Sequence, residues 1–183
     1  ITTPGAVTAN GQMSVGGLLS VSGGVSTAGA MTVSQAAQFG ASVSAAGALT
    51  VASLSTIGSV SAFGDMTAGG VMSAPNAAFT VALTARALRV TDGGLSVGSQ
   101  LTAHGMTVTD GLTAKSISTV GSVTVGTEMV APAVRVSSGG VAVAGGLTAS
   151  SIASDGIITA ASTLQGGGVS VWGSVTCIGI TTS

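Results

Sequence analysis

The chain has 183 residues, of which 5% are charged and 2% aromatic, and its formal net charge is −1. So few lysines and arginines exclude a basic surface for a nucleic-acid backbone, and a hydrophobic content of 45% is too high for a solvated, disordered chain. The 30 glycines do not recur at every third position, which excludes collagen, and no run of about 18 apolar residues lacks Gly, Ser or Thr, which argues against a spanning helix.

One three-residue phrase recurs from one end of the chain to the other. It consists of a large aliphatic residue, a small polar residue and a small or β-branched residue, as in Val7-Thr8-Ala9 and Met13-Ser14-Val15. The first position is Val, Ile, Leu or Met in 30 of 32 such triads, and the middle is Ser or Thr in 24. Successive side chains of a strand point to opposite faces, so each triad predicts a short strand with two residues inward and the hydroxyl outward.

In chain order, the expected strands begin at residues 1, 7, 13, 19, 25, 31, 37, 43, 49, 54, 60, 66, 72, 77, 83, 88, 95, 101, 106, 112, 117, 123, 129, 134, 141, 147, 152, 158, 164, 169, 175 and 180. Twenty steps between them are six residues long, nine are five and two are seven. Because a three-residue strand is too short to be stable alone, the triads must stack on one another. The sequence therefore predicts an all-β solenoid of about 32 short strands, continuous over residues 1–183.

The expected core is made of triad residues that face inward, and it includes Val7, Met13, Leu19, Met31, Leu49, Met66, Phe79, Leu101, Met106, Leu112, Val123, Leu147, Val169 and Val175. The linkers are expected to be sharp corners, where glycine supplies a positive φ or allows a close backbone approach. These corner glycines include Gly5, Gly11, Gly17, Gly23, Gly29, Gly47, Gly58 and Gly64.

Two arrangements of such a coil are open. A single chain could form a left-handed solenoid about 50 Å long, whereas three intertwined chains would form a triple β-helix of roughly 150 Å. In a single chain the five-residue steps would often fail to lie above one another, because they begin at irregular intervals. Three-fold symmetry would place the same corner on every side at one height, so the sequence favours an intertwined homotrimer.

Short phrases of the Leu-Thr-Val or Met-Thr-Val type between glycine corners, such as Leu49-Thr50-Val51, resemble the shaft repeats of phage and large-virus tail fibres and spikes. The resemblance covers essentially the whole chain. It implies a β-helical fibre on a virion or outside the cell. Because neither end of the sequence carries an amphipathic helix or a charged cap, we expect a fragment of a longer fibre or a unit joined end to end. Besides the homotrimer, end-to-end and lateral assembly of copies are open.

Residues that could carry chemistry are few. The one histidine, His104, lies in a two-residue corner without a nearby carboxylate, which argues against a catalytic base. The acidic residues stand singly in corners, which argues against a metal site; they are Asp65, Asp92, Asp110, Glu128 and Asp155. We therefore expect neither an enzyme nor a cofactor.

The remaining distinctive side chains have structural interpretations. Cys177 is expected to face inward as a small hydrophobe. Arg89 and Arg135 occupy middle positions and should project outward, while Phe63 and Trp172 are expected to pack over corners.

These observations predict a structural shaft that holds an attachment domain away from a base, with no nucleic-acid partner and no membrane span. The alternative is a monomeric solenoid that binds ice, or acts as an adhesin, through its Ser/Thr face. A trimeric acyltransferase of the hexapeptide-repeat type is a third possibility, but the chain lacks its catalytic constellation.

Overall fold

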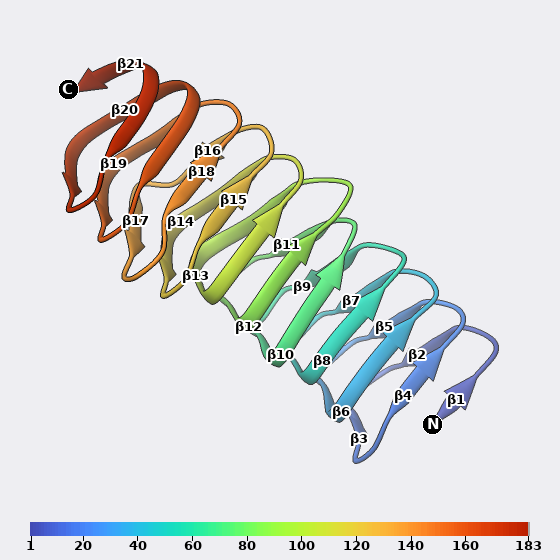
Figure 1. Ribbon diagram of the computed structural model, residues 1–183. Coiled ribbons are helices and arrows are strands. Elements are labelled where there is room, and N and C mark those ends of the chain that lie inside the picture. The colour runs from blue at the N-terminus through green and yellow to red at the C-terminus, as the bar shows by residue number, and fades with distance from the viewer. Residues whose placement is uncertain (183) are drawn as a thin grey trace.

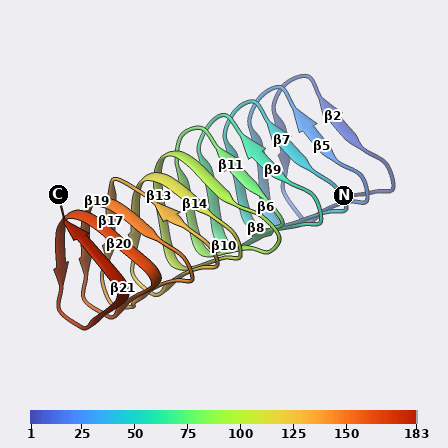
Figure 2. The same ribbon diagram turned by 90° about the horizontal axis from the view of Figure 1, so that it is seen from above.

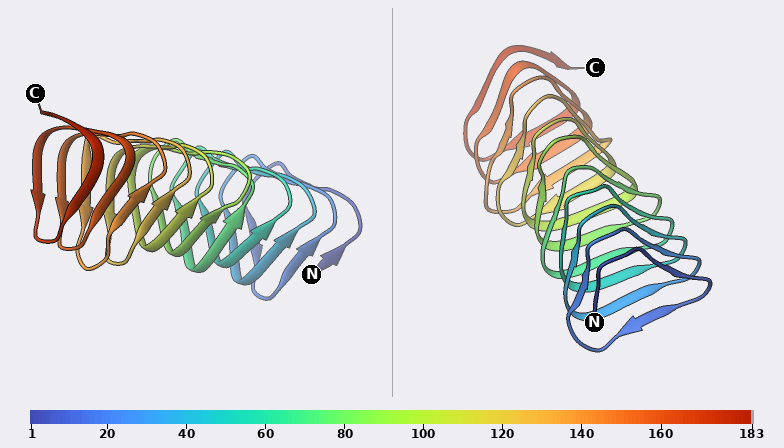
Figure 3. Two further views of the ribbon diagram at one scale, coloured as in Figure 1. Left: turned by 45° about the horizontal axis from the view of Figure 1, so that its top comes forward. Right: turned by 90° about the vertical axis from the view of Figure 1, so that its right-hand side faces the viewer.

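The computed structural model describes residues 1–182, and it forms one parallel β-solenoid of about 11 turns with no helix among these residues (Figure 1). The chain winds around a single axis, and its two ends lie at opposite ends of the rod (Figure 2). Each turn has three sides (Figure 3). The predicted all-β solenoid is confirmed.

The strands are β1 (Thr2–Thr3), β2 (Val7–Ala9), β3 (Met13–Val15), β4 (Leu19–Val21), β5 (Val25–Thr27), β6 (Met31–Phe39), β7 (Val43–Ala45), β8 (Leu49–Thr56), β9 (Val60–Ala62), β10 (Met66–Ala74), β11 (Ala77–Phe79), β12 (Leu83–Val90), β13 (Leu95–Val108), β14 (Leu112–Thr119), β15 (Val123–Val125), β16 (Met129–Val130), β17 (Ala133–Val136), β18 (Val141–Val143), β19 (Leu147–Ser154), β20 (Ile158–Val171) and β21 (Val175–Thr182). The described residues thus form 21 strands and not the 32 separate ones expected. Each triad lies wholly or largely within one of these strands, but pairing continues through some corners, so that β13 and β20 each contain three triads.

Each triad pairs in parallel with the triad that follows 16 to 18 residues later, as Val7 does with Val25 and Leu101 with Ile117. Every third triad therefore lies on the same side of the coil. Face A contains residues 1–3, 19–21, 37–39, 54–56, 72–74, 88–90, 106–108, 123–125, 141–143, 158–160 and 175–177. Face B contains residues 7–9, 25–27, 43–45, 60–62, 77–79, 95–97, 112–114, 129–131, 147–149, 164–166 and 180–182. Face C contains residues 13–15, 31–33, 49–51, 66–68, 83–85, 101–103, 117–119, 134–136, 152–154 and 169–171.

One chain supplies all of these pairings, as in the single-chain alternative. Where two stacked corners differ in length, the register of pairing changes only within the corner. Met31 pairs with Leu49 and Ala37 with Leu54, and the register shift lies between these two pairs. At the edge between faces B and C, four short corners lie above one another in successive turns, with Ser116 paired to Ala133, then to Ser151 and Gly168. The irregular spacing of five-residue steps is therefore compatible with a single-chain coil.

The core is a continuous stack of first and third triad residues. Ten of the expected core residues are at most 3% exposed, namely Leu19, Met31, Leu49, Met66, Phe79, Leu101, Met106, Leu112, Val123 and Leu147. Val7 and Met13, in the first turn, are partly buried against this core. Val169 and Val175 differ from the expectation, being 38% and 37% exposed, because they lie in the last turn and have a neighbouring rung on one side only.

Two triads begin with alanine, and the structure explains both. Ala37 and Phe39 belong to one triad, and Ala77 and Phe79 to another; all four side chains are buried. In each triad the large third residue fills the volume that the small first residue leaves. Such compensation keeps the cross-section filled at normal packing density.

The corner glycines are needed for close approach between turns and not for an unusual backbone conformation. No glycine among the described residues has a positive φ. A Cβ at Gly47 would lie 2.8 Å from the backbone nitrogen of Ala30, and one at Gly64 would lie 2.7 Å from that of Ala48, both in the preceding turn. A Cβ at Gly23, Gly29 or Gly58 would also lie too close to backbone atoms of the preceding turn. A Cβ at Gly5, Gly11 or Gly17 would have no atom within 4 Å. The difference follows from position, because the last three lie in the first turn.

Candidate functional site

The outward hydroxyls, mixed along the sequence, are sorted by the fold into columns. On face C, Thr32, Thr50, Thr67, Thr84 and Thr102 pair with one another in five successive turns. Adjacent members are separated by the strand spacing of about 4.8 Å. The first four are exposed and Thr102 is half-buried. We call these five residues the threonine column.

Small side chains flank the first part of this column. Ala30 and Ala48 precede the triads of Thr32 and Thr50, and Ser34 and Ala52 follow them. The next rows introduce charge at the corners, with Asp65 before Thr67 and Arg86 after Thr84. Face C therefore presents a hydroxyl-and-methyl strip that is flanked only by small, uncharged side chains in its first two rows.

A second set of hydroxyls points inward, which sequence reasoning missed. Thr27, Thr56, Thr119 and Ser154 occupy third triad positions and are 2–8% exposed. Thr27 Oγ1 donates to the Gly29 carbonyl at 3.0 Å, and Thr119 Oγ1 donates to the Gly121 carbonyl at 3.2 Å. Each of the four precedes a corner glycine by two residues, so the signal was present in the sequence. These hydroxyls therefore link each strand end to backbone groups of the adjoining corners.

The charged residues gather in the middle of the rod. All four basic residues, the histidine and three of the five acids lie between Arg86 and Arg135. Only Asp65 and Asp155 lie outside this interval. Because a turn takes 16 to 18 residues, the interval spans about three turns, which we call the charged belt (residues 86–135).

Within the belt, the acids share one edge. Asp92, Asp110 and Glu128 all lie in corners that connect face A to face B, in three successive turns, and all are exposed. Asp110 Oδ1 accepts a hydrogen bond of 3.0 Å from Thr127 Oγ1 of the next turn. Asp110 and Glu128 border an open groove of about 660 Å³ over face B, whose lining includes the outward Ser96 and Thr113.

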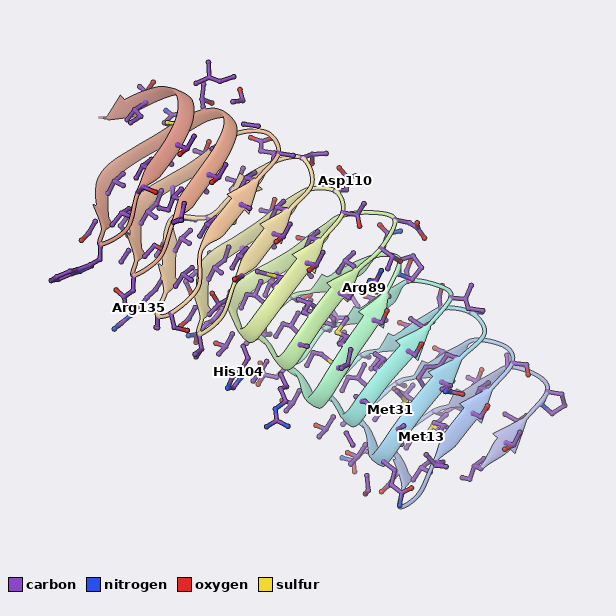
Figure 4. All side chains as sticks on the ribbon, viewed as in Figure 1. Met13, Met31, Arg89, His104, Asp110 and Arg135 are labelled. Atoms are coloured by element: carbon purple, nitrogen blue, oxygen red, sulfur yellow. The ribbon has the colours of Figure 1, made fainter. Side chains whose placement is uncertain are left out.

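The basic residues of the belt lie elsewhere on the perimeter. Arg86 and His104 occupy equivalent corners between faces C and A, one turn apart, since the adjacent Ala87 and Gly105 pair with each other. Arg89 and Arg135 project from middle positions of faces A and C and are exposed, as expected. Asp110 lies along one margin of the rod, with His104 and Arg135 along the opposite margin and Met13 and Met31 nearer the N-terminal end (Figure 4). Arg135 also borders a groove of about 730 Å³ over face C, together with Ser118 and Ser151.

This arrangement gives no support to an acyltransferase or a metal site. His104 is exposed and lies on a different edge from Asp110, so the fold does not bring the two together as an acid–base pair. Among residues 1–182, no three His, Cys, Asp or Glu side chains are grouped so that they could hold a metal ion. Cys177 is half-buried at a third position of face A and packs against the core.

The two corner aromatics differ from the expectation that they pack over corners. Trp172 is 86% exposed and Phe63 is 65% exposed. A corner residue that directly follows a third triad residue points outward, because the alternation of side chains continues into the corner.

No protein-family model matches this sequence, and neither a curated protein nor a solved structure is significantly similar to it. Within the part of the chain that the structure describes, no helix is long and apolar enough to cross a membrane.

Proposed function

We propose that the chain is a rigid structural shaft, a spacer within a virion fibre or an extracellular filament. The observation that carries this proposal is the uninterrupted core: the stacked triads pass from one end of the described chain to the other without an inserted loop or subdomain. About 11 turns at roughly 4.8 Å each make a rod about 50 Å long. The resemblance of the triads to fibre-shaft repeats supports the location.

A spacer can change length by whole turns, which gives a direct test. Deletion of residues 43–59 removes 17 residues, the interval between the paired Val43 and Val60. The shortened chain should keep its fold and lose about 5 Å of length by small-angle X-ray scattering. Deletion of residues 43–51 is the matched control, because it removes two of the three triads of a turn and would move every later triad to a different face. If the whole-turn deletion unfolds as readily as the two-triad deletion, the spacer proposal fails.

The homotrimer expected from the sequence stays a prediction, which the mass measured by light scattering tests. An intertwined trimer and a single-chain coil are distinguished by a disulfide. Thr32 and Thr50 pair in adjacent turns of one chain, at a spacing that suits a disulfide. In a Cys177→Ser background, Thr32→Cys with Thr50→Cys should oxidise within one chain. Intertwined strands would separate these positions, so the absence of an intrachain disulfide would favour the triple helix.

The threonine column favours a second candidate function, in which face C binds ice or a hydroxylated surface. Five threonines at a constant rung spacing form a regular array of hydroxyl and methyl groups. Thr67→Lys should abolish any thermal hysteresis of the purified chain, while Ser61→Lys, on face B of the same turn, should not. Thermal hysteresis that is absent from the unmodified chain, or equally reduced by both variants, would count against ice binding by this face.

A further inference from the structure

The charged belt divides the perimeter of the rod into regions of opposite sign. Its three acids, Asp92, Asp110 and Glu128, lie in successive turns on the edge between faces A and B. Arg86 and His104 lie in successive turns on the edge between faces C and A. Face A separates these two edges, so one copy does not bring them into contact with each other.

The acidic corners and the Arg86–His104 corners belong to the same coil, so both repeat along the rod axis with the same spacing. Adjacent turns are about 4.8 Å apart on every edge. If two rods lie side by side with parallel axes, the Arg86 and His104 corners of one copy can face acidic corners of the other in two adjacent turns, Arg86 as a charged partner and His104 as a hydrogen-bond donor. A second copy of this chain has the same repeat by construction.

Outside the belt the surface carries little charge, and within it two further exposed basic side chains, Lys115 in a corner between faces B and C and Arg135 on face C, do not share an edge. Residues 1–64 contain no charged side chain, and residues 136–182 contain only Asp155. With a formal net charge of −1, two copies also repel each other little. The groove beside Asp110 and Glu128, about 660 Å³ and lined in part by Ser96 and Thr113, gives the acidic edge a concave surface for a projecting corner.

We propose that the charged belt is a lateral docking site for a second copy of this chain, in which the acidic edge of one rod contacts the Arg86–His104 edge of its neighbour. The contact joins two different edges, so it is heterologous and either closes into a ring or extends into a sheet of rods. It goes beyond the spacer function, since a rod can act as a spacer with or without lateral neighbours. Arg89, on the face between the two edges, adds positive charge beside the basic corners.

Sedimentation of the full chain at two salt concentrations tests this contact. Exposed ion pairs act over a Debye length of about 30 Å at 0.01 M salt and about 3 Å at 1 M. The chain should therefore associate at low salt and dissociate at high salt. Sedimentation as one chain at low salt, or association that high salt leaves unchanged, would overturn the proposal.

Charge reversal identifies the edges. Asp110→Lys with Glu128→Lys makes both edges basic, and Arg86→Glu with His104→Glu makes both acidic. Each double variant alone should raise the Kd of self-association about tenfold or more, because side chains of like charge then face each other across the contact. Mixing the two variants should restore association between them, which a merely misfolded variant would not allow.

Asp155→Lys is the matched control, since it reverses an exposed acid outside the belt. Its self-association should change less than about twofold. If Asp155→Lys weakens association as much as the double variants do, or if the mixed variants sediment as separate chains, the belt is not the docking site.

Discussion

The first three turns and the charged belt share a core but differ in their corners. In residues 1–48 every step between triads has six residues, and glycine occupies the centre of most corners. In the belt the steps vary from five to seven residues, and the corners carry Arg86, His104 and Lys115. Leu49 and Leu101 are nevertheless both fully buried, on the same face. Stacking of inward residues therefore determines the coil, and the corners are free to vary in length and charge.

The core is expected to be equivalent in the two regions, and its truncation should have the largest effect. Leu49→Ala and Leu101→Ala each leave a cavity at a position that is 0% exposed. Each should lower the free energy of unfolding by about 2–5 kcal/mol, measured by denaturant titration. Thr50→Ala and Thr102→Ala are the controls on the outward side. A much smaller loss at Leu101 than at Leu49 would mean that the irregular corners loosen the core of the belt.

The next largest effect should come from the glycine corners. In the Gly47→Ala variant, the new Cβ meets backbone atoms of Ala30, which cannot move without shifting a turn. We expect a loss of about 1–3 kcal/mol. Gly11→Ala is the matched control, because Gly11 lies on the same edge with nothing within 4 Å, and its backbone lacks a positive φ. That variant should be neutral or stabilised by up to about 1 kcal/mol.

A control that is as destabilised as Gly47→Ala would show that these glycines are required for their conformation and not for the approach of adjacent turns. Thermal unfolding of the two variants, side by side, makes the comparison.

Removal of an inward hydroxyl should lower the free energy of unfolding by about 1–2 kcal/mol. Thr56 Oγ1 donates to the Ala41 carbonyl at 2.6 Å and accepts from the Gly58 amide at 3.1 Å. Thr56→Val preserves the shape but leaves both backbone groups without this partner. Thr50→Val, in the same strand but outward, should change stability by less than about 0.5 kcal/mol. If chemical denaturation showed the same loss of unfolding free energy in both variants, the hydrogen bonds of Thr56 to the corner would not contribute to stability.

Much of this fold could be predicted from the sequence because alternation within a triad depends only on neighbouring residues. Leu101-Thr102-Ala103 shows by itself which side chains point inward. The partner of a triad depends instead on how many residues the coil takes per turn, and the local pattern is the same for one chain or three. The preference for three chains arose from corner spacing, and the structure shows that single corners absorb a one-residue difference, as between Val33 and Ala36.

The candidate sites were hidden for a related reason. Ser and Thr are mixed along the chain, and the threonine column emerges only when every third triad is read together, from Thr32 to Thr102. Asp92, Asp110 and Glu128 stand singly in the sequence for the same reason, although they share an edge. Exposure of the corner aromatics could have been predicted, because the alternation that places Ala62 inward places Phe63 outward.

The smallest effect on stability is expected from these aromatics, and it sharpens the distinction between core and corner. Trp172 is 86% exposed, so Trp172→Ser should change the free energy of unfolding by less than about 0.5 kcal/mol. Phe63→Ser, in a regular glycine corner of the N-terminal half, should behave in the same way. Phe79→Ser is the control, since it places a hydroxyl in a buried position and should cost several times more. If Phe63→Ser were as costly as Phe79→Ser, corner side chains would contribute to the core, and the corners would not be free to vary independently of the stack.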